Sequence, residues 1–160
     1  MADDGSGFLA FFERHHVELS RLAYLLTGDA AGADDLAADA LGQVRRNWSR
    51  MGDDPAAHAR RLVATLARGR ERRLLLPGPG RRDAAGAMDL PGALRRLPHR
   101  RRVCVVLRYA SGLTDDEVAR ALGISPATVR SRTAKGVRRL TELLGGPLAS
   151  TGPGGREAAR

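Results

Sequence analysis

Apolar side chains recur at the spacing of one helix face in two long stretches of the chain, residues 8–75 and 93–144. The first stretch contains three such runs, from Phe8 to Leu26, from Ala33 to Trp48 and from Ala59 to Leu66. A glycine follows the first run and an Asp-Pro pair precedes the third, and these are typical signals of a helix end and a helix start. The pattern therefore predicts three helices in this stretch.

The second stretch contains a helix, a short turn and another helix. Thr114 and Glu117 are spaced as a capping box, in which each side chain bonds the backbone N–H of the other residue. Gly123 breaks the first helix, and Ser125-Pro126 supplies a cap and a first-turn proline for the second. Two helices joined by a tight glycine turn are typical of a helix-turn-helix that reads DNA.

The second helix of this motif presents short hydroxyls and long cations on its outer face, provided that Val129, Val137 and Leu140 pack inward. Such side chains suit a major groove, where Arg reads guanine and cations bind phosphate. The residues predicted to contact DNA are Ser125, Thr128, Arg130, Ser131, Arg132 and Lys135. A plain helical hairpin with a charged exterior is the alternative, but the caps, the glycine turn and the basic face together favour DNA binding.

Arginines also gather on the third predicted helix, on the arc opposite its apolar residues. They are Arg60, Arg61, Arg68 and Arg72. A helix with cations along one side can lie along a nucleic-acid backbone, so these four are predicted DNA contacts as well. For any single arginine, the alternative is a side chain that only solvates the helix.

Composition agrees with a helical fold. Aromatic residues make up 4% of the 160 residues, so the core must be built mostly from Leu, Val and Ala, which suits helical bundles better than a β-sandwich. Residues 76–92 are rich in Gly, Pro and Ala and indicate a linker, and 145–160 indicate a disordered tail. We predict an all-α protein of two small helical domains, 8–75 and 93–144.

The distribution of charge suggests two kinds of partner. The chain has 27 Lys and Arg against 18 Asp and Glu, a net charge of +9. Residues 1–54 hold 5 basic and 10 acidic side chains, whereas 55–88 hold 8 and 2, and 89–146 hold 12 and 5. An acidic front followed by two basic blocks predicts one surface for a protein partner and others for phosphate backbones.

Other function classes fit the sequence poorly. The four histidines and the single Cys104 lack metal-ligand spacing, so we expect no enzyme activity, no metal and no cofactor. Asp34 and Asp35 point about 100° apart on a helix, which disfavours a pair of general acids. Because no apolar run is long enough to cross a bilayer and the first residues do not resemble a signal peptide, we expect a cytoplasmic protein that does not bind membranes.

With these motifs the chain resembles the extracytoplasmic-function (ECF) sigma factors, compact members of the sigma-70 family with only regions 2 and 4. The resemblance covers about four-fifths of the chain, and residues 94–143 look like region 4, which reads the upstream promoter element. Region 2 is suggested by Tyr24–Asp29 followed by Asp34-Asp35-Leu36. The segments that carry the likeness to region 4 are Leu97-Pro98, Val105–Tyr109, Gly112–Thr114, Glu117–Ala119, Leu122–Ser125 and Thr128–Arg132.

The resemblance implies a subunit that binds core RNA polymerase and directs transcription initiation at specific promoters. The residues implied to dock on the clamp helices of the polymerase are Asp34, Asp35, Leu36, Asp39, Ala40, Gln43 and Val44. The arginine-bearing helix would meet the downstream promoter element and help to open it. Many members are held by an anti-sigma protein that clamps the two domains, and the length of the linker permits such a partner here.

The chain departs from the family pattern in region 2. Ala38-Asp39 stand where the family usually has Gln-Glu, His58 stands in place of an aromatic residue, and Thr65 in place of a common Asn. Two alternatives therefore stay open. One is a DNA-binding regulator that never joins polymerase, and the other is a sigma-like decoy that binds a protein without melting DNA.

Overall fold

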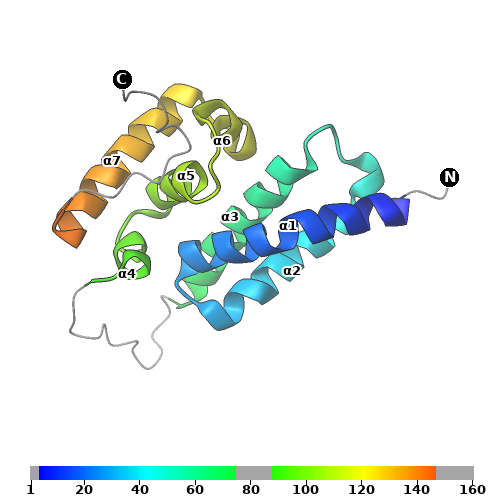
Figure 1. Cartoon of the computed structure of the whole chain (residues 1–160), viewed down its shortest axis with the longest axis horizontal. Coiled ribbons are helices and arrows are strands. Elements are labelled where there is room, and N and C mark those ends of the chain that lie inside the picture. The colour runs from blue at the N-terminus through cyan, green and yellow to red at the C-terminus, as the bar shows by residue number, and fades with distance from the viewer. Residues whose placement is uncertain (1–3, 75–87, 147–160) are drawn as a thin grey trace, which may run out of the picture.

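The computed structural model describes residues 4–74 and 88–146, and these residues form helices and turns with no strand among them. The all-α prediction is confirmed. The first group of helices is α1 (Asp4–Thr27), α2 (Ala30–Arg46) and α3 (Pro55–Leu74), with a short 3-10 turn at Trp48–Arg50. The second group is α4 (Leu90–Arg95), α5 (His99–Tyr109), α6 (Asp115–Leu122) and α7 (Pro126–Leu144) (Figure 1).

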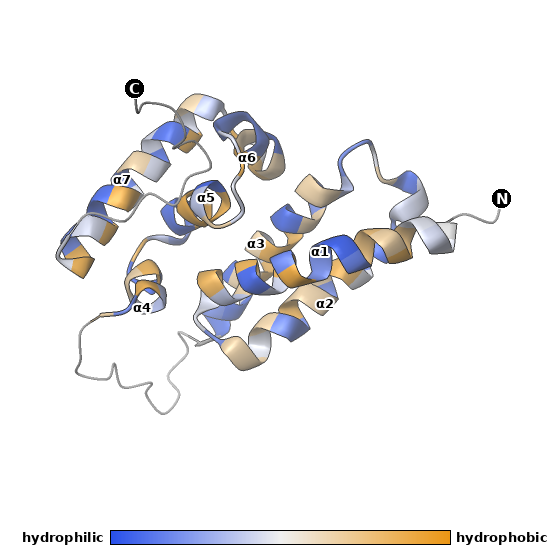
Figure 2. Cartoon of the chain, in the orientation of Figure 1, coloured by the Kyte–Doolittle hydropathy of each residue, from blue (hydrophilic) through white to orange (hydrophobic). Residues whose placement is uncertain are grey.

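Helices α1, α2 and α3 pack as a three-helix bundle around the apolar faces that the periodicity predicts. Leu19, Leu22 and Leu26 of α1 are fully buried, as are Val44 of α2 and Val63 of α3. Figure 2 shows the hydrophobic sides of these helices turned toward one another. Burial of this apolar surface is the main source of the bundle's stability.

Local signals set the ends of these helices. Gly28 has a φ of +68°, a left-handed conformation that glycine adopts without strain, and it ends α1. The Asp29 side chain then caps α2 by accepting the N–H of Gly32 at 3.2 Å. Asp54 caps α3 in the same way through the N–H of Ala57 at 2.9 Å. The sequence therefore predicts both turns of the bundle correctly.

The second group is held together by the close approach of α5 and α7. Val103, Val106 and Leu107 of α5 are buried. Gly136 of α7 is buried as well, and a Cβ at this position would lie 2.5 Å from Cγ2 of Val105. A glycine here lets the two helix backbones come together, so that α7 lies flat against α5.

The two groups pack against each other, because α3 contacts α6 while α1 contacts α4 and α5. Arg102 of α5 lies between them, and its side chain is only 2% exposed. Its guanidinium donates to the carbonyl oxygen of Leu26 in α1 at 2.7 Å and to Oε1 of Glu71 in α3 at 2.9 Å. It also donates to the carbonyl oxygens of Leu94 and Leu97 in its own group. The apolar core runs continuously through both groups.

Two predicted boundaries shift in the structure. The linker was expected to extend to residue 92, but α4 begins at Leu90, where the Asp89 side chain caps it by accepting the N–H of Gly92 at 2.9 Å. The tail was expected from residue 145, but Gly145 belongs to the end of α7 as its left-handed cap. The rest of the predicted linker, through residue 87, and the tail from residue 147 lie outside the described residues.

Candidate nucleic-acid interface

The start of α6 has the predicted capping box. The Thr114 hydroxyl accepts the N–H of Glu117 at 3.2 Å, and the Glu117 carboxylate accepts the N–H of Thr114 at 2.7 Å. The bond from the Thr114 backbone, reinforced by the Thr114 side chain, holds the pKa of Glu117 below its usual value. The first turn of α6 is thus fixed by local bonds and does not depend on a partner.

The turn between α6 and α7 fixes the angle at which α7 leaves. Gly123 ends α6 with a φ of +66°, in the left-handed region. The Ser125 hydroxyl then accepts the N–H of Thr128 at 3.1 Å, with Pro126 in the first turn of α7. Helix α7 packs against α5 and α6 and buries the face that carries Val129, Thr133, Gly136 and Leu140. Its opposite side therefore stays open to solvent.

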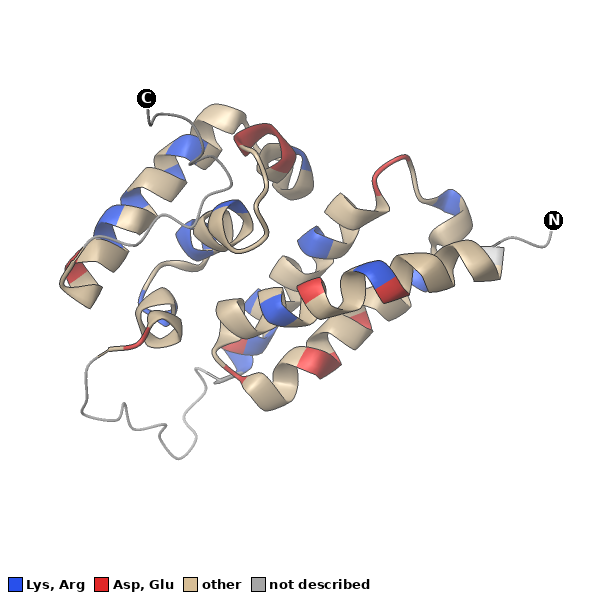
Figure 3. Ribbon diagram, viewed as in Figure 1, with Lys and Arg blue, Asp and Glu red and all other residues tan. Residues whose placement is uncertain are grey.

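The predicted DNA contacts of the motif lie mostly on this open side of α7. Ser125, Arg130, Ser131 and Lys135 are exposed, and the Arg130 side chain keeps 62% of its area in solvent. Thr128 is half-buried, and its hydroxyl lies 2.8 Å from that of Ser125. Figure 3 shows basic residues following one another along α7. Their contact with DNA stays a prediction.

Arg132 differs from this group, because it is half-buried and not on the outer face where the sequence predicts it. Its guanidinium lies beside the thiol of Cys104 on α5. Burial raises the pKa of that thiol despite the neighbouring charge, so Cys104 stays protonated, as expected of a core residue. The helical position of Arg132 at the edge of the buried face explains the difference.

The four predicted arginines of α3 have different surroundings. Arg60 makes a two-bond ion pair with Glu18 of α1, with Nε 2.7 Å from Oε1 and Nη2 3.2 Å from Oε2. Burial disfavours the charged form of Glu18, but hydrogen bonds from Arg60 and His15 outweigh it and hold the pKa of this carboxyl below its usual value. Arg60 is therefore engaged inside the bundle and does not project freely, contrary to the sequence-based expectation.

Arg61, Arg68 and Arg72 are exposed. A Cβ on Gly123 would lie 3.6 Å from the nearer guanidinium nitrogen of Arg61, so this arginine lies against the turn that follows α6. Helix α6 thereby covers part of the arginine face of α3, while Arg68 and Arg72 sit farther along the helix.

Three of the residues predicted on α2 to bind polymerase are in the core. Leu36, Ala40 and Val44 are buried, so the prediction that they contact a partner is wrong. They belong to the same apolar face that packs α2 against α1 and α3. The outer side of α2 carries the other four: Asp34, Asp35, Asp39 and Gln43.

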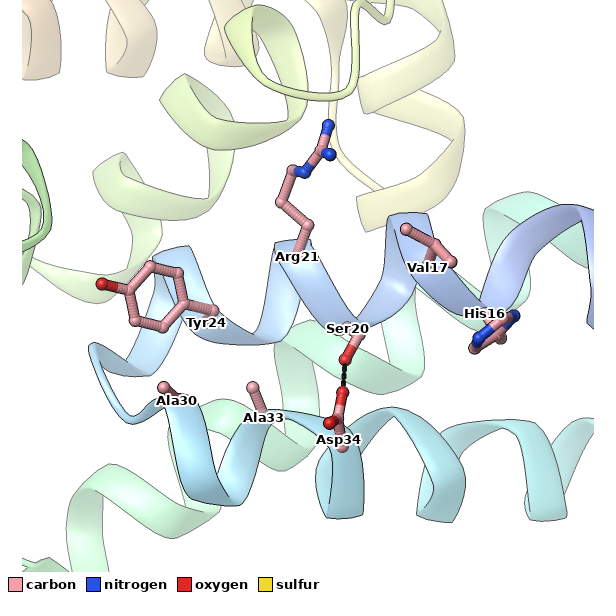
Figure 4. A pocket seen from close by; sticks show the side chains of 8 residues that line it. All are labelled: His16, Val17, Ser20, Arg21, Tyr24, Ala30, Ala33 and Asp34. Carbon is pink, nitrogen blue, oxygen red and sulfur yellow. Dashed lines mark hydrogen bonds between the residues drawn. The ribbon is translucent and has the colours of Figure 1, made fainter.

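A groove of about 360 Å³ runs between α1 and α2 beside these acidic residues (Figure 4). Val17, Tyr24 and Ala33 give it an apolar lining, and 56% of the area of Val17 is exposed. The Ser20 hydroxyl donates to the Asp34 carboxylate at its rim. His16 and Arg21 line the groove as well, so charged groups of both signs border an apolar floor, which has the character of a surface for a protein partner.

A second cavity, of about 400 Å³, lies where the 3-10 turn meets α3. Four residues with polar side chains line it together with Met51 and Gly52, namely Asn47, Arg50, Asp54 and His58. The cavity opens at the N-terminal end of the helix whose arginines are predicted to meet DNA.

Sequence reasoning missed the polar cluster that joins the two groups of helices. His99 Nδ1 lies 3.5 Å from Glu71 Oε2, next to the bond between Glu71 and Arg102. Burial and the positive charge of Arg102 lower the pKa of His99 against the opposing effect of Glu71, so the ring is neutral at pH 7. The pairings join residues far apart in the sequence, and no local pattern signals them.

In the described part of the chain, no group of His, Cys, Asp and Glu side chains is arranged to hold a metal ion. No described helix combines the length and the apolar character that a membrane span requires.

Comparisons with known proteins agree on one family. The family described as Sigma-70, region 4 matches residues 87–140. The ECF RNA polymerase sigma factor SigM of Mycobacterium tuberculosis is 32% identical over 158 residues, covering 91% of this chain and 81% of SigM. SigL of the same organism, also an ECF RNA polymerase sigma factor, is 30% identical and covers 82% of this chain and 85% of SigL.

A solved structure shows the same fold. The sigma factor RpoE of Bartonella quintana, crystallised with the anti-sigma factor NepR, superposes with a TM-score of 0.71. The match is 21% identical in sequence and covers 87% of this chain and 97% of RpoE.

Proposed function

This chain belongs to the ECF sigma factors of the sigma-70 family, and we propose that it recruits core RNA polymerase through α2 and reads promoter DNA through α7 and α3. The main support for the proposal is that α6 and α7 form a complete helix-turn-helix and that the outer side of α7 is basic and exposed. A sigma factor supplies recognition, and the polymerase supplies the nucleotide chemistry. The chain would accordingly work in the cytoplasm, without an enzyme activity or a cofactor of its own.

The upstream promoter element is the proposed target of α7. Arg130, Ser131 and Lys135 combine a side chain that can read guanine, a short hydroxyl and a phosphate-binding cation within two turns of one helix. Ser125 and Thr128 lie at the N-terminus of α7, where backbone N–H groups and the helix dipole favour a phosphate. The capping box and the glycine turn hold this constellation rigid before DNA arrives.

The downstream element is the proposed target of α3. Arg61, Arg68 and Arg72 are all exposed, and Arg61 lies against the turn that follows α6. The cavity at the start of α3 suits a base that leaves the duplex, because it is large enough for one base and offers amide, carboxylate and imidazole groups. We propose that an extruded base enters there during promoter opening.

Polymerase binding is proposed for the outer side of α2 and the adjoining groove. Asp34, Asp35 and Asp39 form an acidic face suited to a basic partner helix, and the exposed Val17 offers an apolar anchor next to it. An anti-sigma protein is a further proposed partner, since RpoE of Bartonella quintana was crystallised with one.

Reconstitution tests the proposal. The full chain is mixed with core RNA polymerase and a panel of promoter fragments, and both complex formation and run-off transcripts are scored. A sigma factor gives a complex and a transcript from particular promoters. A complex without any transcript would identify the decoy, and DNA binding without a complex would identify a regulator that works apart from polymerase.

The base-capture step has its own measurement. A fluorescent adenine analogue in the downstream element brightens when it leaves the stack in the presence of the holoenzyme. His58→Ala and Asn47→Ala should reduce this signal while leaving binding to the closed duplex intact. An unchanged signal in both variants would place the extruded base elsewhere.

A further inference from the structure

A carboxylate at the start of α6 lies between two arginines from the neighbouring helices. Oδ1 of Asp115 is 2.8 Å from Nε of Arg108 on α5. Oδ2 of the same side chain is 4.0 Å from Nη1 of Arg130 on α7. One acidic side chain on α6 thus lies beside cations of both α5 and α7, and one of these, Arg130, is the more exposed of the two arginines predicted on α7 to contact DNA.

Asp115 is itself held in place from two sides. It follows Thr114, whose capping box with Glu117 fixes the first turn of α6. Arg108 binds the Asp115 carboxylate and also donates to the carbonyl oxygen of Leu113, just before the cap. The Asp115 side chain is 27% exposed, so its charge is only partly screened by water.

This arrangement restricts where Arg130 can point. A long arginine side chain with most of its area in solvent otherwise samples many rotamers, and that freedom is lost on binding a base. The fixed carboxylate attracts the guanidinium toward α6 and away from solvent-side rotamers. It also repels phosphate oxygens nearby, which disfavours use of Arg130 as a backbone clamp relative to a base-edge contact.

We propose that Asp115 is a positioning residue that aims Arg130 at a base edge and so sets part of the sequence discrimination of α7. The proposal rests on the proposed function, because it needs α7 to read duplex DNA. Without the carboxylate, the guanidinium groups of Arg108 and Arg130 would repel each other, and Arg130 would turn toward phosphates at any sequence.

The test is selection from random DNA duplexes by holoenzyme assembled from the full chain and core polymerase. The wild type should enrich an upstream motif. Arg130→Ala should flatten the preference at one position of that motif. Asp115→Asn should flatten the same position, with about a tenfold lower enrichment of the preferred base, while the other positions keep their preference.

Matched variants separate positioning from general effects. Asp116→Asn removes the same charge one residue along, where the side chain is exposed and bonds neither Arg108 nor Arg130, and it should select the wild-type motif. Asp115→Glu keeps the charge but moves it by one methylene, and it should restore a partial preference. The thermal midpoint of each variant reports on folding, and it should change little in Asp115→Glu.

The results that overturn the proposal are equally specific. If Asp115→Asn and Asp115→Glu both select the wild-type motif, Asp115 does not position Arg130. If either variant lowers the preference at every position together with the thermal midpoint, while Arg130→Ala affects one position, the role of Asp115 is structural. Absence of any motif for the wild type would contradict the proposed function itself.

Discussion

At the scale of single residues, the described arginines differ in how far their charge is buried and paired. Arg60 and Arg102 are half-buried or buried and bind carboxylates or carbonyl oxygens, which offset the loss of hydration around their charge. Arg68, Arg72 and Arg130 are exposed, although Nη1 of Arg130 lies 4.0 Å from Oδ2 of Asp115. Only the second kind is available to phosphates and bases without rearrangement.

Arg130→Ala should weaken binding to the selected promoter by roughly 1–3 kcal/mol if the side chain reads a base. The loss should be confined to sequences with the preferred base at one position. Fluorescence anisotropy with the selected duplex and with single-base variants checks this. A uniform loss across all sequences would make Arg130 a phosphate contact.

Glu18→Gln should lower the free energy of unfolding by about 1–2 kcal/mol at pH 7, because it leaves the guanidinium of Arg60 without its charged partner. Since the folded pKa of Glu18 is lowered, the contribution is present above about pH 4.5 and disappears as the pH falls through the folded value. Urea denaturation at several pH values measures both effects.

The control for this pair is Glu142→Gln, which breaks a surface bond to Arg139 of 2.9 Å. Both of those side chains are about half exposed, so the variant should change stability by no more than about 0.5 kcal/mol. An equal loss of stability in the two variants would show that burial does not increase the contribution of the Glu18–Arg60 pair.

At the scale of elements, α6 and α7 are defined by their caps more than by their length. Helix α6 spans only Asp115–Leu122, too short to be stable alone in water. The capping box bonds free backbone N–H groups at its N-terminus, and the N–H of the left-handed Gly123 bonds the carbonyl oxygen of Ala119 at its C-terminus. The burial of Val118 and Ala119 supplies the remaining stability and joins α6 to the core.

Thr114→Ala removes the hydroxyl that accepts the N–H of Glu117, and we expect a loss of about 1 kcal/mol in the free energy of unfolding. Thr65→Ala is the matched control. Thr65 lies in the middle of α3 on its exposed side, and its hydroxyl donates to the carbonyl oxygen of Arg61. Alanine favours a helix interior, so this control should be neutral or slightly stabilising. Thermal denaturation followed by circular dichroism distinguishes the two, and equal effects would contradict a capping role.

At the scale of the whole molecule, the two groups of helices share one core and a partly buried polar cluster. The bond between Arg102 and Glu71 and the contact between α6 and α3 hold the second group of helices against the three-helix bundle. In this arrangement α7 is open on its basic side, whereas part of the arginine face of α3 lies under α6.

Glu71→Ala should loosen this packing without unfolding either group, because Arg102 keeps its bonds to Leu94 and Leu97 within its own group. We expect a loss of about 1.5–3 kcal/mol in the interaction between the groups. Hydrogen exchange should then speed up in the parts of α3 and α5 that face each other. Glu142→Ala, on the surface of α7, should leave exchange there unchanged, and the same result for Glu71→Ala would show that the bond does not hold the groups together.

Salt should weaken all contacts between the basic surface and DNA phosphates together. The affinity of the full chain for duplex DNA should fall linearly on a log–log plot against salt concentration, because phosphate contacts release counterions. Replacing Arg68 and Arg72 by Gln should reduce that slope by roughly 2. Arg45 and Arg46 on α2 provide a control pair of equal charge, and an unchanged slope after the α3 replacements would remove α3 from the DNA-binding surface.

The helices and most of their ends follow from local sequence alone. The capping box at Thr114, the left-handed Gly123 and the restart at Ser125 depend on bonds between residues a few positions apart, so the local sequence contains all the information. The apolar periodicity also assigned Leu36 and Val44 to the core. Their prediction as polymerase contacts conflicted with that periodicity, and their burial decides the matter.

Which charged groups face each other depends on how the helices pack in three dimensions. The pairing of Arg60 with Glu18 spans 42 residues and the bond from Arg102 to Leu26 spans 76, and the identity of the residues alone signals neither. Whether an arginine is exposed depends on which helix packs over it, and that is a property of the assembled core. The basic sides of α3 and α7 that are proposed to meet DNA were therefore predictable from local pattern, but which of their arginines stay exposed was not.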